Sequence, residues 1–142
     1  MKQSLLILTF VLLGISSSFG QENFKVGTNF PKDFQYKFEG VYFVMNNISN
    51  NKPIAYIASI KDHEISDDLY MMLDGRLTKL TFHESMSGEK FFDNNDFIVT
   101  NKNIEGTEKQ YEGGASVKCI LTIKNKSTKR VQKFTCMSFT VD

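Results

Sequence analysis

Two segments near the C-terminus, ASVKCILTIK (residues 115–124) and KRVQKFTCMSFTV (residues 129–141), decide the fold class of this chain. Both are rich in Val, Ile, Thr and Phe, the residues that strands favour, and turn-forming residues 125–128 separate them. They therefore predict a terminal β-hairpin. If Ser127 and Thr128 are the two loop residues, the pairing places Cys119 directly opposite Cys136.

Strand patterns also occupy the middle of the chain. Phe34, Tyr36 and Phe38 alternate with polar residues, and an apolar run at residues 41–45 follows Gly40, which predicts a strand with a bend at the glycine. A turn is expected at residues 46–53. Further short strands are predicted at residues 54–60, 70–73, 76–82 and 97–99, and an extension of the last strand toward residue 104 is left open.

Asp74-Gly75 lies between two of these strands and is typical of a tight hairpin turn. A helical turn that begins at Ser66 and ends at Gly75 is the alternative for this segment. With the hairpin, the sequence contains about eight short strands separated by turn signals. This pattern predicts an all-β domain, either a small antiparallel β-barrel or a compact sandwich.

Residues 1–20 have the layout of a secretory signal peptide. Lys2 provides the positive charge, residues 5–13 form an apolar run interrupted only by Thr9, and Ser18-Phe19-Gly20 provides a cleavage site. The run is shorter than the roughly 20 residues of a membrane-spanning helix. We expect a periplasmic or secreted protein of one domain, residues 21–142, with no membrane insertion after cleavage.

The charge of the expected mature chain is balanced. Without Lys2, the 17 Lys and Arg residues become 16, which equals the 16 Asp and Glu residues. A neutral chain without a block of like charge gives no electrostatic basis for binding nucleic acid or an anionic membrane. The short basic cluster at residues 124–130 coincides with the expected hairpin tip.

The two cysteines predict one disulfide, because an exported chain folds in an oxidising compartment. Directly opposed strand residues have Cβ atoms about 4.5–5.5 Å apart, slightly wider than disulfide geometry prefers. A redox-active dithiol would instead need close spacing at a helix N-terminus. We therefore expect a structural Cys119–Cys136 bond.

Candidate catalytic and metal-binding residues do not form a recognised pattern. His63-Glu64 and His83-Glu84 could bind zinc or calcium together with nearby aspartates, but neither HExxH nor a DxDxDG loop is present. Ser85 and Ser87 lack a GxSxG elbow. The sequence therefore predicts a non-enzymatic protein without a cofactor or a metal, and metal binding by the His-Glu pairs is left open.

The most specific functional pattern lies between residues 73 and 102. It contains the turn Leu73-Asp74-Gly75, the string SMSGEKF at residues 85–91, and then Phe97 and Lys102. This order resembles the membrane-attached and periplasmic inhibitors of C-type lysozyme. The upstream string YKFEG at residues 36–40 is similar to the opening strand of that family, so the resemblance covers about half of the mature chain.

The resemblance implies an eight-stranded barrel that projects two loops into the lysozyme cleft. By position, Ser87 and Lys102 take the roles of the residues that engage the two catalytic carboxylates of the enzyme. A lysine ammonium pairs with a carboxylate, a serine hydroxyl donates to either carboxyl state, and Gly88 permits a sharp turn. The complete set of expected partner-binding residues is Ser85, Ser87, Gly88, Lys90, Phe91 and Lys102.

The chain departs from the family pattern at three places. Phe38 stands where the family usually has a cysteine, Thr100 is nearest to an expected tryptophan, and Asn103 replaces a glycine. Two of these differences lie beside Lys102, in the second loop.

Three other functions remain open. Residues 38–42 are similar to the opening of lipocalins, which implies a carrier for a small lipid-like ligand in a hollow barrel. An immunity or adaptor protein would bind a different protein target. A small secreted hydrolase would need one of the His-Glu pairs in a cleft.

Overall fold

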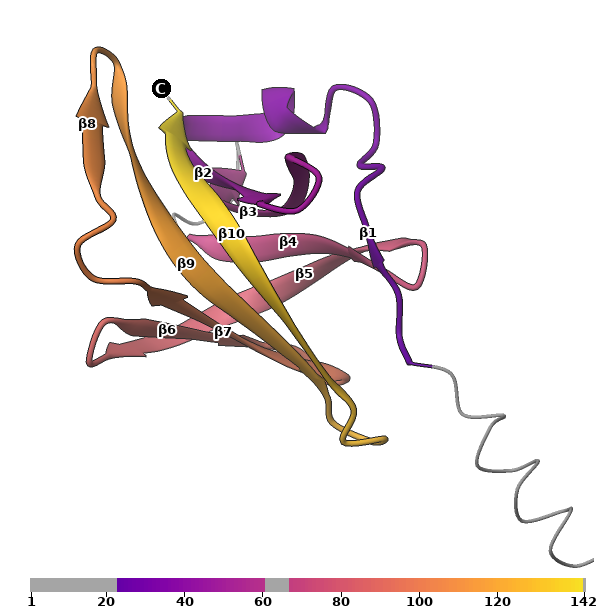
Figure 1. Cartoon of the computed structure of the whole chain (residues 1–142). Helices are drawn as coiled ribbons and strands as arrows, with labels where there is room; N and C mark the ends of the chain where they lie inside the picture. Colours follow the sequence, from indigo (N-terminus) through magenta and orange to yellow (C-terminus); the bar gives the residue numbers. More distant parts are fainter. Residues whose placement is uncertain (1–22, 61–66, 142) are drawn as a thin grey trace, which may run out of the picture.

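The computed structural model describes residues 23–60 and 67–141 and shows a closed antiparallel β-barrel of eight strands (Figure 1). The predicted barrel is confirmed, and the sandwich is not formed. The expected signal peptide and His63-Glu64 lie outside the described residues. The strands of the ring are β2 (Phe38–Asn47), β3 (Lys52–Ile60), β4 (Asp68–Leu73), β5 (Arg76–Met86), β6 (Glu89–Asp93), β7 (Phe97–Asn103), β9 (Gly114–Asn125) and β10 (Val131–Val141).

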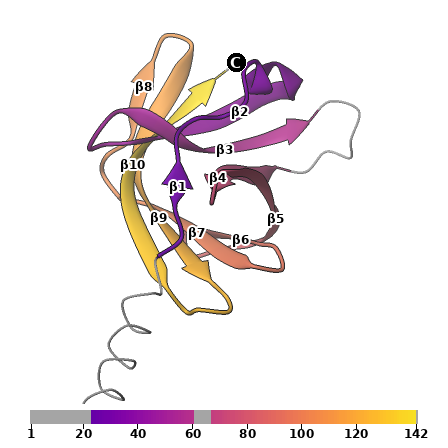
Figure 2. The same ribbon diagram turned by 90° about the vertical axis from the view of Figure 1, so that its right-hand side faces the viewer.

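The barrel has a simple up-and-down order. Each strand of the ring pairs with the next one along the chain, and β10 pairs with β2 to close the ring (Figure 2). Two short strands lie outside it: β1 (Val26–Gly27) pairs with β4, and β8 (Lys109–Tyr111) pairs with β9. No helix in the part of the chain that the structure describes is long and apolar enough to cross a membrane.

Two predicted turns have the expected geometry. Asp74 and Gly75 both adopt positive φ angles, 51° and 76°, as a type I′ hairpin turn requires. This turn joins β4 to β5, so the helical alternative for the segment is wrong. Gly40 also has a positive φ of 70°, and the β2–β3 register shifts between Glu39 and Phe43, which confirms the bend.

The first predicted strand begins later in the structure than the sequence pattern indicated. Residues Phe34–Lys37 form a short 3-10 helix, and the strand begins only at Phe38. The alternation of aromatic and polar residues was therefore misleading there, because Phe34 is buried against the outside of the barrel while Tyr36 is exposed.

The terminal hairpin has the predicted register, with Cys119 directly opposite Cys136. Its loop is longer than two residues: Asn125 N–H donates to the carbonyl of Arg130, and Lys129 takes a positive φ of 64°. Asn125 stabilises the loop further, since its side-chain oxygen accepts hydrogen bonds from the backbone of Ser127 and Thr128.

The predicted Cys119–Cys136 disulfide is not formed, because both cysteines are free thiols buried in the core. The Cys136 thiol donates to the carbonyl of Phe134. A hydrogen bond with Cys119, together with burial, raises the pKa of the Cys136 thiol, so this group stays protonated at neutral pH. Direct opposition on neighbouring strands leaves the Cβ atoms wider apart than the roughly 3.8 Å of a typical disulfide.

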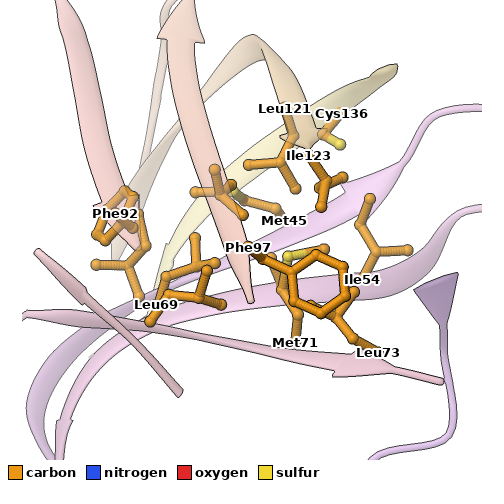
Figure 3. Close-up of a cluster of buried hydrophobic side chains, with 14 of the residues drawn as sticks. Met45, Ile54, Leu69, Met71, Leu73, Phe92, Phe97, Leu121, Ile123 and Cys136 are labelled. Atoms are coloured by element: carbon orange, nitrogen blue, oxygen red, sulfur yellow. The ribbon is translucent and has the colours of Figure 1, made fainter. Parts of the chain in front are cut away.

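The barrel interior is filled by apolar side chains from almost every strand (Figure 3). Alternate residues of a strand point to the same face, so the positions that face inward are mostly apolar. Of the adjacent Phe91 and Phe92, only Phe92 is fully buried, as expected. The core contains Met45, Ile54, Ala55, Ile57, Leu69, Met71, Leu73, Leu80, Phe92, Phe97, Val99, Cys119, Leu121, Ile123 and Cys136.

The N-terminal segment covers one end of this core. Phe24 packs edge-on against Phe97 with ring centroids 5.3 Å apart. The backbone of Lys25 exchanges hydrogen bonds with Asp74, and the Gln132 side chain donates to the carbonyl of Phe24. These contacts hold the chain across the end of the barrel where the β4–β5 turn lies.

A second apolar cluster lies on the outer face of β2, β3 and β4. Phe34 packs against the rings of Phe38, Tyr56 and Tyr70 at centroid distances of 4.9, 6.0 and 5.5 Å. Burial, and then the charge of Asp68, raises the pKa of Tyr70 to about 12, so its phenol is neutral at physiological pH. The 3-10 helix is thereby attached to the barrel by an aromatic contact.

Phe34→Ala should lower the free energy of unfolding by about 3 kcal/mol, because it removes a buried ring and leaves a cavity. Urea unfolding followed by circular dichroism measures the change. Tyr36→Ala is the matched control on the same short helix, since Tyr36 is 70% exposed. It should shift stability by less than about 0.5 kcal/mol. Equal effects of the two substitutions would contradict the packing role of Phe34.

Candidate functional site

The β5–β6 hairpin ends in an exposed two-residue turn formed by Ser87 and Gly88. Their φ angles are 51° and 75°, again the geometry of a type I′ turn. A Cβ atom on Gly88 would meet nothing within 4 Å, so the positive φ, rather than space, favours glycine there. The turn lifts the hydroxyl-bearing Ser87 into solvent at the tip of the hairpin.

Lys102 lies beside this tip, on β7. It is directly opposite Glu89 of β6 on one side and Ile120 of β9 on the other. No carboxylate among residues 23–60 and 67–141 lies within ion-pair distance of the Lys102 ammonium. The exposed lysine is therefore free to pair with a group from outside the chain.

Ser87, Gly88 and Lys102 line one open cavity of about 540 Å³. The hairpin tip forms one wall, and the end of β7 with the β7–β8 loop forms the other. The resemblance predicted Ser87 and Lys102 as partners in one function, and the β6–β7 register places them together. The remaining lining residues are Asn103, Ile104, Glu105, Glu108 and Ile120.

The loop wall of the cavity is fixed to β9. Ile104 N–H donates to the carbonyl of Lys118 at 2.8 Å, and the Thr107 hydroxyl donates to the carbonyl of Ile104 at 2.6 Å. Lys118 N–H in turn donates to the Thr107 hydroxyl at 3.0 Å. Sequence reasoning missed this wall and β8, although Gly106, with a φ of 79°, is a turn signal that could have indicated it.

Three glutamate side chains lie in or beside the cavity. Glu105 and Glu108 line it, and Glu89 lies opposite Lys102, so three carboxylates accompany one ammonium. Exposed apolar side chains lie on the same surface: Met86 at the hairpin tip is 57% exposed and Ile120 is 37% exposed. An exposed apolar rim beside a free charge is typical of a binding surface.

The other three expected partner-binding residues lie apart from this cavity. Ser85 is exposed on β5, directly opposite Lys90. Lys90 extends over the ring of Phe43, a residue packed against the core, and so points into the barrel. Phe91 is half-buried and opposite Thr100. Of the six residues, Ser87, Gly88 and Lys102 therefore line the cavity, and the other three lie outside it.

His83, considered above as a metal ligand, instead contacts a carboxylate. Its Nε2 meets Asp93 Oδ1, while Lys126 Nζ lies 3.0 Å from Asp93 Oδ2. The hydrogen bonds from Lys126 and then from His83 lower the pKa of Asp93. Within the described residues, no group of three His, Cys, Asp or Glu side chains is arranged to hold a metal ion. The contacts tie the β9–β10 loop to β5 and β6.

Comparison of the chain with protein-family models, with curated proteins and with solved structures finds no match.

Asp93→Asn should lower the unfolding free energy by about 0.5 kcal/mol at pH 7, the range of partly exposed ion pairs. The folded pKa of Asp93 is depressed, so its stabilisation is present above the unfolded value near 3.9 and is lost as pH falls through the folded pKa. Urea titrations at pH 7 and pH 3 should show the difference from wild type shrinking at pH 3. Asp96→Asn is the control, and a difference independent of pH would contradict the ion-pair origin.

Proposed function

We propose that the protein is exported and binds another protein with the Ser87–Gly88 tip and Lys102, and that its partner is a C-type lysozyme. The observation that carries the proposal is the single cavity lined by all three residues. The tip and Lys102 are separated by more than a dozen positions in the sequence, and the barrel brings them to one surface. The chain has no catalytic role in this proposal.

The chemistry of the cavity suits an enzyme cleft that contains carboxylates. The Lys102 ammonium has three donors for an ionised carboxylate, and its cross-strand neighbours leave it accessible. The Ser87 hydroxyl donates to a carboxyl group in either protonation state. Occupation of both catalytic groups would block substrate and inhibit the enzyme.

The shape of the tip supports insertion into a concave partner. The turn is exposed throughout residues 85–88, and the strand pairing of Ser85 and Met86 with Lys90 and Glu89 holds it in one conformation. A preformed loop loses little conformational entropy on binding. Met86 adds an exposed apolar side chain that a cleft can bury.

The three glutamates beside the cavity indicate the charge that the partner surface carries around its cleft. Glu89, Glu105 and Glu108 would lie at the rim when Lys102 enters a cleft. Opposite charges across a rim speed association and exclude partners of like charge. The proposed partner therefore has carboxylates within its cleft and basic residues around it.

An immunity or adaptor protein would use the same surface for a different target. The cavity and the exposed tip support this second candidate equally, whereas the paired positions of Ser87 and Lys102 favour the lysozyme.

Lys102→Met should weaken inhibition of a C-type lysozyme at least tenfold, because the carboxylate in the cleft would lose its only cationic partner while remaining desolvated. Ser87→Ala should weaken it less, by about threefold to tenfold, the range expected for one hydrogen bond. Inhibition constants from turbidity assays with increasing protein measure both effects.

Lys133→Met is the matched control, since Lys133 is an exposed lysine of β10 outside the cavity. It should leave the inhibition constant unchanged within twofold. Absence of inhibition by the wild-type protein at micromolar concentration would overturn the lysozyme assignment. Equal losses with Lys133→Met and Lys102→Met would overturn the assigned surface.

A further inference from the structure

The inner face of the barrel changes from apolar to polar toward one end. Cys136 is a core residue of β10, and Ser138 and Thr140 follow it at two-residue intervals, so they occupy the same inward face. Val117 of β9 lies opposite Ser138, and Phe43 of β2 lies opposite Thr140. The end of the barrel where β7 and β10 end and β2 and β9 begin is therefore lined by hydroxyl groups together with an aromatic ring.

A cavity of about 230 Å³ occupies this end of the barrel. It is smaller than the sites for drug-sized ligands, about 300–1,000 Å³, so it suits a ligand of one small ring rather than a long chain. Phe43, Ala115 and Val117 form its apolar part. Its polar lining residues are Asn103, Glu108, Gln110, Ser116, Ser138 and Thr140.

Two hydroxyl groups of this lining have no partner among residues 23–60 and 67–141. Ser138 is only 6% exposed, and neither its hydroxyl nor that of Thr140 forms a hydrogen bond with another described residue. A buried hydroxyl without a partner is costly, and most such groups bond to the protein or to an ordered molecule. Gln110 of β8, which lies opposite Ala115, adds an amide-bearing residue to the same lining. The cavity therefore offers hydroxyl and amide groups to a polar ligand.

The charges around the cavity favour a neutral ligand. Glu108 is the one charged residue among the described lining residues, and its carboxylate forms no ion pair within their ranges. Lys90 is not part of the lining, but its ammonium lies 5.3 Å from the centroid of the Phe43 ring. A carboxylate ligand would meet Glu108, whereas an ammonium ligand beside the Phe43 ring would approach Lys90, and like charges repel. A ligand without charge avoids both penalties.

We propose that this cavity binds a neutral sugar, as a single pyranose ring. A pyranose has an apolar C–H face and a rim of hydroxyl groups. The C–H face lies against Phe43. The hydroxyl groups exchange hydrogen bonds with Ser138, Thr140 and Gln110, whose side chains can both donate and accept. The Glu108 carboxylate accepts a hydrogen bond from a further hydroxyl of the sugar.

The sugar site does not depend on the proposed protein partner. Asn103 and Glu108 line both this cavity and the cavity of Ser87 and Lys102, so the two cavities are neighbours. The hydroxyl groups that distinguish the sugar site lie on the inner face of β10, and neither Ser87 nor Lys102 belongs to its lining. Sugar binding and lysozyme inhibition are therefore measured separately, and either can fail without the other.

The experiment is a titration of the ¹⁵N-labelled protein with the methyl pyranosides of glucose, galactose and mannose, followed by NMR chemical shifts. 2-Methoxytetrahydropyran is the matched probe with the same ring and no hydroxyl group. The uronate and the 2-amino-2-deoxy derivative of the bound sugar, at pH 6, are the anionic and cationic probes. We expect saturable shifts at Phe43, Gln110 and Thr140 with at least one methyl pyranoside. It should bind at least tenfold more tightly than 2-methoxytetrahydropyran and at least threefold more tightly than either charged derivative.

Thr140→Val keeps the shape of the side chain and removes the hydroxyl, so it should weaken sugar binding about threefold to tenfold, the range of one hydrogen bond. Thr135→Val is the matched control, since Thr135 is an exposed threonine on the outer face of β10. It should leave the affinity unchanged within twofold. A well-dispersed spectrum of each variant establishes that it is folded.

Three results would overturn the proposal. The first is the absence of saturable shifts with all three methyl pyranosides up to roughly 20 mM, well above a millimolar dissociation constant. The second is equal binding of 2-methoxytetrahydropyran or of a charged derivative. The third is an equal effect of Thr140→Val and Thr135→Val on the affinity.

Discussion

The pairing of β10 with β2 is the constraint on which the rest of the structure depends. Every other contact in the eight-stranded ring joins strands that follow one another in the chain, whereas this pairing joins Tyr42–Asn47 to Cys136–Val141, as numbered in the register. It removes two sheet edges that would otherwise be exposed, and it gives the apolar inner face an enclosed volume. Met45 and Cys136 are fully buried because this pairing brings their strands together. The aromatic cluster around Phe34 then secures the outer side of β2.

The ends of the barrel differ, and the cavity lined by Ser87 and Lys102 lies at one of them. Phe24 and the N-terminal segment cover the end beside the β4–β5 turn. At the other end, the β5–β6 hairpin carries the Ser87–Gly88 tip beside the cavity that Lys102 also lines, whereas Lys90 of β6 points toward the barrel interior. Adjacent positions of β6, Glu89 and Lys90, thus serve opposite faces. A strand alternates its side chains, so one hairpin presents residues both to the outer surface and to the barrel interior.

Much of the fold followed from local sequence signals, because hairpin turns and two-residue periodicity are local properties. Asp74-Gly75 specified its turn, and the register that opposes Cys119 to Cys136 followed from the hairpin. The disulfide did not follow, since opposition alone does not provide disulfide geometry. The 3-10 helix at Phe34 depends on packing against Tyr56 and Tyr70, which are distant in sequence. For the site, the Ser87–Gly88 turn was predictable, whereas its position at the same cavity as Lys102 depends on the β6–β7 register. Lys90 and Phe92 are two residues apart on one strand, so the sequence pattern could have indicated that Lys90 faces inward. The resemblance to the lysozyme inhibitors instead favoured a partner-binding role for Lys90.

In the proposed function, the Ser87–Gly88 tip and the β7–β8 loop form one protein-binding surface. Hydrogen–deuterium exchange of the protein, alone and with a saturating C-type lysozyme, tests it most directly. We expect slower exchange at residues 86–89 and 102–108, and unchanged exchange in the β9–β10 loop at residues 126–129. Protection confined to that loop, or to the aromatic cluster around Phe34, would contradict the claim, as would unchanged exchange throughout the chain.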